Sequence, residues 1–516
     1  MSKLPPKLNY DTSESEQWFS IEQDPQVEFF RKARKNHSKD PFRPIFHLSP
    51  PNHVMNDPNG ICQWNGYFHL FYQYRPNSHD DAVHWGHAMS KDCVFWQDMP
   101  LALYPDQEND CYSGQTLVER DRVIAIYHGT GKGNAVATAA DPLLINWDKN
   151  QNNPVIPIVP TDNSGNPYRV FDPCIWKEED GYYSLSGTFK DGDRSVNCKA
   201  VDHLFRSKNL DTWEYIGPLI ESGFMTEPGE DGAVPNFLPI GNNKHILLFF
   251  SHKRGSQYFI GDYDDETHKF EPLSHGRMTY GPLLLGRLHA PSATIDDLGR
   301  LISIFNVKEG IRYRGWSDIM SLPRQLSLNE DDSLKITPIQ ELNHLRQEYA
   351  TFPTTKVSAN ETIILDGIEG KSIEIKAEVD PGSASECGFD VFRSDDGIEK
   401  TRISFIRTKT RFNPSDTLQI DISGSSLPED KISSPPESGP FILEETETLK
   451  LRIFIDRSIV EVFANDKQCL TIRSYPTLPT SKKVAFFSLN GSSELIALEK
   501  WNMQSIWPEL NYLEGN

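Results

Sequence analysis

Short runs of apolar residues, separated by polar turns, dominate the chain from residue 46 onward. Runs rich in β-branched and aromatic residues cover positions 67–74, 123–128, 181–187, 245–251 and 301–307. Each run is bounded by Gly, Asp, Asn or Pro, which is typical of strands joined by turns. Apolar residues at helical spacing are almost absent before residue 335. The pattern therefore predicts an all-β domain over residues 46–335.

The beginning of the chain has a different character. Residues 1–45 are polar and rich in Lys, Glu and Pro. We expect this segment to be an N-terminal arm that carries one short helix near residues 26–35.

A degenerate repeat runs through the β-rich region. Each copy is a strand, a small polar turn and a Trp followed closely by an acidic residue, and the copies are 88–100 (AMSKDCVFWQDMP), 137–150 (ATAADPLLINWDKN) and 204–217 (LFRSKNLDTWEYIG). A repeat of roughly 50–65 residues in an all-β chain is typical of a propeller whose blades have about four strands. Residues 46–335 have room for five blades. The alternative is that aromatic strands simply resemble one another.

The remaining chain predicts a second β domain. Residues 338–350, PIQELNHLRQEYA, have helical spacing and are interpreted as part of a linker over 336–354. Strands of alternating polarity return afterwards, for example at 372–379 and 401–406, and 451–464 and 468–475 predict a hairpin. We expect a β-sandwich over residues 355–516. Glu461 and Arg473 are expected on a solvated or interdomain face of it.

Composition and charge narrow the class of function. A chain of 516 residues is long enough for two domains, and its net charge of −21 argues against nucleic acid or an anionic membrane as partner. A neutral small molecule such as a sugar is compatible with that charge. No run of about 18 apolar residues predicts a membrane span. The second domain could brace the first, bind polymer or mediate formation of a homodimer.

The cysteines and the first residues predict a compartment. The seven Cys are scattered without a C-x-x-C pair, so neither a disulfide framework nor a zinc site is expected. The first twenty residues contain no apolar core of a secretory signal. We expect a cytoplasmic protein, or a secreted one if a signal was removed from the sequence. No metal and no cofactor are expected.

Three acidic stretches on separate candidate blades carry the predicted chemistry. Asp57 lies in 47–60, HLSPPNHVMNDPNG, where Pro58 and Gly60 form a stiff turn. Asp172 lies in 168–176, YRVFDPCIW, and three acids crowd 225–237, MTEPGEDGAVPNF. The inner strands of a propeller converge, so these carboxylates can meet at one end. Taken singly, Asp57 could be only a turn residue and the third stretch only a surface loop.

Paired carboxylates are what glycoside hydrolysis requires. One carboxyl attacks the sugar or activates water, and the other stays protonated to donate to the leaving oxygen. A third can anchor sugar hydroxyls through charge-assisted hydrogen bonds. The spacing alone does not decide among these roles.

Several motifs are spread along the chain, namely 47–60, 65–74 (NGYFHLFYQY), Trp85-Gly86-His87, Tyr112-Ser113-Gly114, Asp172-Pro173, 315–328 (GWSDIMSLPRQLSL) and 451–463 (LRIFIDRSIVEVF). Together they resemble family 32 of the glycoside hydrolases, the invertase, inulinase and levanase family. The resemblance runs from about residue 45 to residue 510. It implies a five-bladed propeller followed by a β-sandwich, and hydrolysis of β-fructofuranosides with retention of configuration.

The resemblance also implies roles for individual residues. Asp57 is expected to be the nucleophile, and Asp172 the carboxylate that stabilises the transition state and holds fructose hydroxyls. The residues expected to line the fructose pocket are Asn56, Gln73, Trp85 and Ser113.

Two departures from the family pattern affect the assignment. The family usually has Arg immediately before the second Asp; Phe171 stands there, and Arg169, two residues earlier on the same face of a strand, is the candidate to replace it. The family's Glu-Cys-Pro acid/base motif reads Ala233-Val234-Pro235. We expect Glu230 to be the displaced proton donor, ahead of Glu227 and Asp231. Glu227 is also a candidate substrate contact.

Two other functions stay open at this point. The same acids would serve a fructosyltransferase, whose acceptor is another sugar rather than water. The missing Glu-Cys-Pro motif also suits a sugar-binding propeller that has lost its donor.

Overall fold

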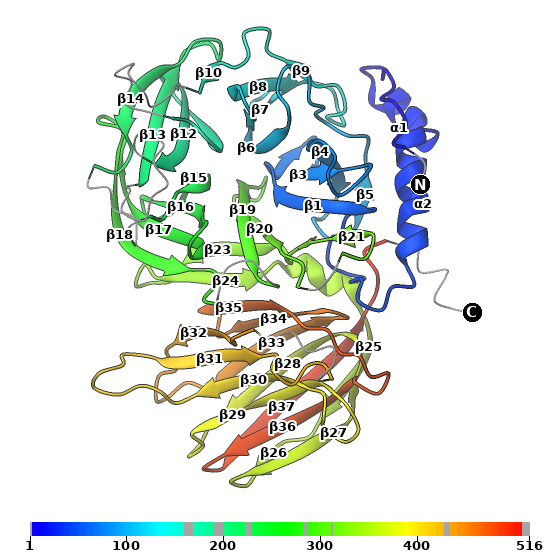
Figure 1. Ribbon diagram of the computed structural model, residues 1–516. Helices are drawn as coiled ribbons and strands as arrows, with labels where there is room; N and C mark the ends of the chain where they lie inside the picture. Colours follow the sequence, from blue (N-terminus) through cyan, green and yellow to red (C-terminus); the bar gives the residue numbers. More distant parts are fainter. Residues whose placement is uncertain are drawn as a thin grey trace.

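Strands up to residue 338 form five sheets that are arranged as blades around a central axis (Figure 1). The computed structural model describes residues 3–158, 169–189, 200–221, 227, 229–281, 286–310, 313–427 and 434–507. The first strand of each blade lies innermost, and these strands are β1 (His53–Pro58), β6 (Cys111–Val118), β11 (Pro173–Glu178), β15 (Ala233–Gly241) and β19 (Leu288–Ile295). From β6 through β11, β15 and β19 to β1 each contacts the next around the axis, and β6 lies against other strands of the first blade. The predicted five-bladed propeller is thereby confirmed.

The outer strands of each blade follow in antiparallel order. They are β2 (Cys62–Trp64), β3 (Tyr67–Arg75), β4 (His84–Ser90) and β5 (Trp96–Asp98); β7 (Val123–Gly129), β8 (Gly133–Ala139), β9 (Asp148–Lys149) and β10 (Ile156–Pro157); β12 (Gly181–Phe189), β13 (Ala200–Ser207) and β14 (Glu214–Pro218); β16 (Lys244–Ser251), β17 (Gly255–Asp264) and β18 (Lys269–Arg277); β20 (Leu301–Val307), β22 (Ile319–Met320), β23 (Arg324–Leu328) and β24 (Leu334–Pro338). The five strands expected from the apolar runs are all present.

A late segment closes the ring. Strand β21 (Trp316–Ser317) pairs in parallel with β1, with His53 opposite Trp316 and Val54 opposite Ser317. The last part of the propeller chain therefore completes the first blade, so the sheet ring has no free edge at this point.

The Trp repeat corresponds to a recurring turn before an outer strand. Cys93, Leu144 and Leu210 each stand three residues before the repeat Trp, and each has a positive φ, of 62°, 50° and 69°. In the second and third copies the indole N–H of the Trp donates to the carbonyl of that residue, at 2.8 Å and 3.1 Å. The repeat is thus a structural unit of the blade.

The second domain is a sandwich of two antiparallel sheets. One sheet contains β25 (Arg346–Phe352), β26 (Thr355–Val357), β28 (Ser372–Asp380), β33 (Leu449–Asp456), β34 (Ile459–Ala464), β35 (Gln468–Arg473) and β37 (Ser493–Met503); the other contains β27 (Glu361–Glu369), β29 (Glu386–Arg393), β30 (Thr401–Ile406), β31 (Asp416–Asp421), β32 (Glu437–Phe441) and β36 (Lys483–Leu489). Aliphatic and aromatic side chains of both sheets form one buried core between them.

Two local predictions need correction. The helical spacing of 338–350 gives only a 3₁₀ helix, Gln340–Leu345, after which β25 pairs with β37 of the sandwich. The segment 451–464 is not one strand but two, because the chain turns at Arg457, whose φ is 55°. The predicted hairpin between β34 and β35 is present.

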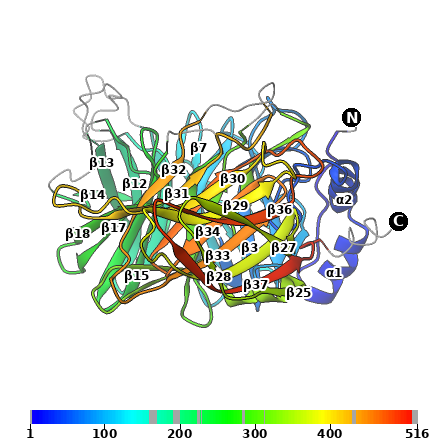
Figure 2. The same cartoon turned by 90° about the horizontal axis from the view of Figure 1, so that it is seen from below.

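Buried charges join the two domains. Glu461 of β34 accepts hydrogen bonds from the Leu322 amide at 2.7 Å and from the Arg324 guanidinium at 2.7 Å, both in the propeller. Arg473 is buried, and its Nη1 lies 3.4 Å from Glu309 Oε2. In Figure 2, which views the molecule from below, the sandwich strands lie in front of the propeller. The two residues therefore belong to the interdomain face.

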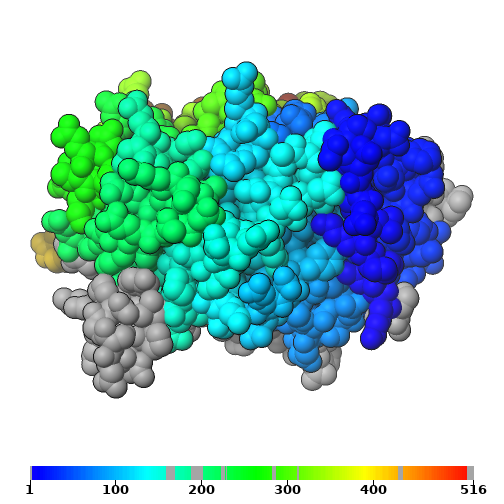
Figure 3. Space-filling model, turned by 90° about the horizontal axis from the view of Figure 1, so that it is seen from above, coloured from blue at the N-terminus to red at the C-terminus, as the bar shows by residue number. Residues whose placement is uncertain are grey.

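Two helices lie against the side of the first two blades (Figure 1), and Figure 3 shows their atoms in dark blue against the lighter blue and cyan of those blades. They are α1 (Glu14–Glu22) and α2 (Pro25–His37), and Asp24 caps α2, because its carboxylate accepts from the amides of the first turn. Gln17 donates to Asp141 at 2.8 Å, and Arg34 pairs with the buried Asp98. The arm thus contains two helices rather than one. Among the described residues, no helix is long and apolar enough to span a membrane.

Candidate active site

One end of the propeller axis holds a cavity of about 390 Å³ that all five blades line. The inner strands bulge where they reach it. In β1, Asn56 and Asp57 stand together opposite Gln73, because the pairing shifts between Met55 and Pro58. Similar bulges occur at the cavity ends of β6, β15 and β19. A bulge turns two successive side chains to one side, where a regular strand would send one of them away.

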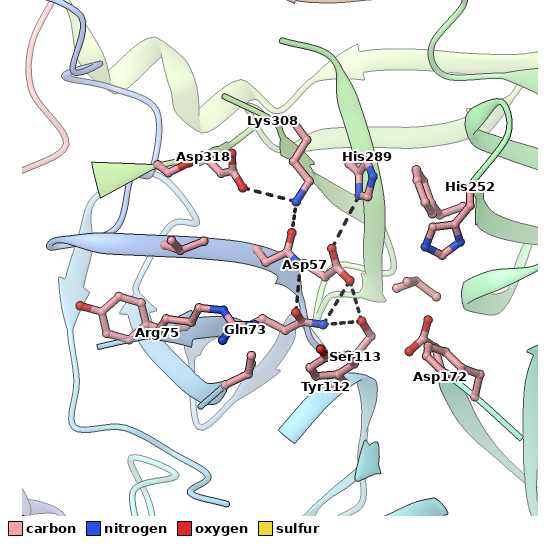
Figure 4. Close-up of a pocket in the computed structure, with 18 of the residues that line it drawn as sticks. Asp57, Gln73, Arg75, Tyr112, Ser113, Asp172, His252, His289, Lys308 and Asp318 are labelled. Carbon is pink, nitrogen blue, oxygen red and sulfur yellow. Dashed lines mark hydrogen bonds and ion pairs between the residues drawn. The ribbon is translucent and has the colours of Figure 1, made fainter. Parts of the chain in front are cut away.

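Asp57 is held at one oxygen and open at the other. Its Oδ2 accepts hydrogen bonds from the Ser113 hydroxyl at 2.6 Å and from the Gln73 amide at 3.2 Å. No described group donates a hydrogen bond to its Oδ1, and His289 Nδ1 lies 3.8 Å away (Figure 4). Burial raises the pKa of Asp57, but His289, Lys308 and Ser113 together hold that pKa below its usual value. An ionised carboxylate with a free oxygen is suited to nucleophilic attack.

A chain of hydrogen bonds fixes the polar wall beside Asp57. The Asn56 amide donates to Gln73 Oε1 at 3.0 Å, and Gln73 donates to Ser113 Oγ at 2.7 Å. Lys308 Nζ donates to Asn56 Oδ1 and lies 3.3 Å from Asp318 Oδ2. Because every amide in this chain is engaged, the wall presents a fixed array of donors and acceptors to a ligand.

Asp172 enters the cavity from the blade opposite. It is 3% exposed, and its Oδ1 has no hydrogen-bond partner among the described residues. Burial and the nearby charge of Asp57 raise the pKa of Asp172 to about 7. Two carboxyls with pKa values displaced in opposite directions are the arrangement that glycoside hydrolysis uses.

Two histidines that sequence reasoning passed over also line the cavity. His289 packs on Phe250 with ring centroids 3.7 Å apart, and burial lowers the pKa of His289 to about 4. His252 follows β16 and is held by Asp231, with 2.6 Å between His252 Nδ1 and Asp231 Oδ2. The signal for both is weak in the sequence, since each is a lone His beside an apolar run.

Two predicted pocket residues do not line the cavity. Trp85 is fully buried between the first two blades, where its indole N–H donates to the Tyr112 carbonyl at 2.9 Å. It supports the cavity from behind. Arg169 is exposed to solvent, and Phe171 lines the cavity wall instead. The ring of Phe171 stacks on that of His128, with 4.5 Å between the ring centroids.

The acidic loop before β15 divides into three differently placed carboxyls. Residues 222–226 and 228 lie outside the described residues. Glu227 binds Arg254 with both oxygens at 2.8 Å and 2.9 Å, away from the cavity wall. Glu230 is buried, accepts from Gln257 at 3.3 Å and is also absent from the wall; burial raises its pKa. Asp231 reaches the cavity through His252.

Within the described ranges, no group of three or more His, Cys, Asp or Glu side chains is arranged to hold a metal ion. The polar lining of the site consists of carboxyls, amides, hydroxyls, three imidazoles, a guanidinium group and an ammonium group.

Both domains of the chain match models of one known protein family. The family model described as "Glycosyl hydrolases family 32 N-terminal domain" matches residues 47–338, and the C-terminal model of the same family matches residues 341–502. A levanase of Bacillus subtilis is 29% identical over 92% of this chain and 72% of its own length. A sucrose-6-phosphate hydrolase of Zymomonas mobilis is 27% identical over 92% of this chain and 94% of its own.

Solved structures share the fold. Fructan 1-exohydrolase IIa of Cichorium intybus superposes with a TM-score of 0.79 at 24% identity, and covers 90% of this chain and 98% of its own. A variant of that protein in complex with 1-kestose gives a TM-score of 0.80.

Proposed function

Because the chain belongs to family 32 of the glycosyl hydrolases, we propose that it cleaves terminal β-D-fructofuranosides through a covalent fructosyl-enzyme. Its substrates are sucrose, fructo-oligosaccharides or both. The relatives named above carry the names of levanase and sucrose-6-phosphate hydrolase. The observation that supports the proposal most is the free oxygen of Asp57, which faces a sugar-sized cavity across from the buried Asp172.

Asp57 is the proposed nucleophile. Its lowered pKa keeps it ionised, and Ser113 and Gln73 bind Oδ2, which leaves Oδ1 to attack the anomeric carbon of a bound sugar. Fixed donors cost little reorganisation when the bond forms. Asn56, Gln73 and Ser113 would bind the fructose hydroxyls around it.

Asp172 is the proposed stabiliser of the flattened, positively charged ring. A carboxylate serves this role only when ionised, because it must attract the developing charge and accept from sugar hydroxyls. Its unpartnered Oδ1 is available for such a hydroxyl. Activity then requires a pH at which Asp172 has lost its proton.

Glu230 is the proposed proton donor and, after attack, the base that activates water. Burial raises its pKa, which is the direction of shift that favours a proton donor. Its carboxyl lies behind the cavity wall, so the donor assignment rests on chemistry and on position in the loop. Asp172 is the other carboxyl with a raised pKa, and the test therefore includes both.

Turnover of three variants on sucrose, inulin and levan tests these roles. Asp57→Asn should abolish hydrolysis of all three substrates. Glu230→Gln should lose about a hundredfold or more on sucrose but retain much of its rate on a fructoside with an activated leaving group, which needs no proton. Asp172→Asn should be slow on both. The reverse pattern for Glu230 and Asp172 would show that Asp172 is the donor.

Product analysis separates hydrolysis from transfer. Equal amounts of glucose and fructose released at high sucrose are expected for a hydrolase. An excess of glucose together with longer fructosides would mean that sugar, rather than water, accepts the fructosyl group.

A reducing compartment such as the cytoplasm is the proposed location. The six cysteines in the described part of the chain are all buried and unpaired. Buried thiols of this kind persist where disulfides are not formed.

A further inference from the structure

His252 faces the reacting carboxyls from the fourth blade. It directly follows β16, and its ring borders the cavity on the same side as Asp172, with Asp57 between them and the polar wall (Figure 4). Its side chain is 57% exposed, although the cavity around it is lined largely by buried residues. An exposed ring at this place can reach both the solvent and the carboxyls.

Asp231 holds this imidazole at two points. One carboxylate oxygen accepts from the His252 amide at 2.8 Å, and the other lies 2.6 Å from its Nδ1. The Asp231 side chain is 8% exposed, so the pair is held at the wall. With Nδ1 bound to a carboxylate, Nε2 is left as the atom that faces the cavity, and the ring binds a proton more tightly. Asp231, Asp172 and Asp57 all raise the pKa of His252 against the effect of burial.

Asp172 needs a positive neighbour. Asp57 and Asp231 both disfavour its ionised form, as burial does, while His252 and the Val234 amide favour it. The other cations of the cavity are engaged elsewhere: Lys308 binds Asn56 and Asp318, and Arg75 donates to the Asp81 carbonyl. His289 faces Asp57, and because burial lowers its pKa to about 4 it brings no positive charge to Asp172 at neutral pH.

We propose that His252, clamped by Asp231, is a positioning residue that supplies the positive charge keeping Asp172 ionised during fructosyl transfer. This inference rests on the proposed function, in which Asp172 acts as a carboxylate. It gives the loop before β15 a second task besides proton donation. No bond to His252 forms or breaks.

The pH profile of kcat/KM tests the inference in the intact protein. His252→Gln removes the charge, so protonation of Asp172 should become easier and the acidic limb should move to higher pH by about one unit. The variant should then lose about tenfold more activity at pH 5.5 than at pH 8.5, which lies well above the pKa of about 7 of Asp172. His252→Lys, which retains a charge, should keep the limb near its original place. Asp231→Asn should move it in the same direction as His252→Gln.

A matched control is available on the outside of the molecule. His344 also pairs through Nδ1 with an aspartate, Asp92, at 3.4 Å, and its side chain is 60% exposed. His344→Gln should leave the profile unchanged. An equal loss of rate at every pH in His252→Gln would show a merely structural role, and retention of activity only on activated fructosides would make His252 a proton donor; either result overturns the proposal.

A second readout does not depend on turnover. Coupling between two titrating groups is reciprocal, so Asp172→Asn should lower the pKa of His252. Titration of labelled histidine by NMR measures this shift in the native protein and in the variant. If the native protein hydrolyses no fructoside, the proposed function fails, whereas an unchanged histidine pKa means that the inference fails by itself.

Discussion

At the scale of single residues, the cavity shifts the pKa values of two aspartates in opposite directions. Asp57 and Asp172 are both buried, yet the pKa of the first is lowered by its neighbours and that of the second is raised to about 7. The difference comes from partners: Asp57 has a hydroxyl, an amide and a nearby ammonium group, while Asp172 has mainly other carboxylates around it. A buried charge with few partners costs stability.

Because a buried charge at Asp172 lowers the stability of the fold, replacing Asp172 by a neutral side chain should raise it. Its folded pKa lies above the value of 3.8 for an unperturbed side chain, so the folded protein holds a proton that the unfolded chain releases. Stability therefore falls as the pH rises from about 4 to about 7. Asp172→Asn should remove this fall and stabilise the protein by up to about 4 kcal/mol at pH 8, with little gain at pH 4. Urea unfolding at both pH values measures it.

A surface aspartate provides the comparison for that experiment. Asp265 lies exposed in the turn between β17 and β18, and Asp265→Asn should change stability equally little at both pH values. A gain for Asp172→Asn that does not depend on pH would contradict the assigned cause.

At the scale of elements, the bulges of the inner strands build the site. Four of the five inner strands have one at the cavity end, and three of these carry Asp57, Ser113 and His289. The turn after β1 adds a second constraint. Gly60 has a φ of 82°, and its amide donates to Ser292 Oγ at 3.0 Å. A Cβ there would lie 2.6 Å from the Thr116 backbone nitrogen.

Alanine substitutions at two glycines of the first blade can separate the effect of steric crowding on stability from that of backbone strain. Gly60→Ala meets both obstacles, while Gly66→Ala meets only the unfavourable φ of 78°, since nothing described lies within 4 Å of its Cβ position. Strain alone costs about 1 kcal/mol or slightly more. Gly60→Ala should cost clearly more than Gly66→Ala in urea unfolding, and should lower kcat because Asp57 is displaced. Equal costs and an unchanged kcat would show that the turn does not position Asp57.

The sequence predicts the elements better than it predicts the site. The strands and the Trp repeat are local signals, since each depends on residues that are close in the chain, and both led correctly to a propeller. The bulges are not local, because they depend on which residue of the neighbouring strand stands opposite. His252 and His289 therefore could not be recognised from the sequence. The helical spacing of residues 338–350 led to a wrong prediction, because the end of this segment belongs to β25. That strand pairs with β37, almost at the end of the chain.

At the scale of the whole molecule, buried ion pairs join propeller to sandwich. Glu461 is fully buried and contacts Arg324, His47 and the Leu322 amide. Burial alone would raise the pKa of Glu461, but Arg324 and His47 have the larger combined effect and lower that pKa to about 2. A folded pKa below the unfolded value of 4.5 gives stability that is present above pH 4.5 and is lost as the pH falls toward 2.

Glu461→Gln should remove this interdomain contribution. The variant should lose about 3–5 kcal/mol at pH 7, because the Arg324 charge stays buried without its counter-charge. Its stability should fall less steeply than that of the native protein between pH 4.5 and pH 2.5. Urea unfolding across this pH range provides the measurement. Glu499→Gln, on the outer face of the sandwich, should have almost no effect.

The pairing of β1 with β21 has a consequence for synthesis on the ribosome. His53 emerges long before its partner Trp316, and a ribosome that adds about 5–20 residues per second needs roughly 13–50 seconds to cover the interval. During that time the inner edge of the newborn first blade has no neighbour on one side. A nascent chain with an unpaired edge invites mispairing. Chaperone demand should therefore be greatest while the middle blades are being translated, and should drop once residue 317 has left the exit tunnel.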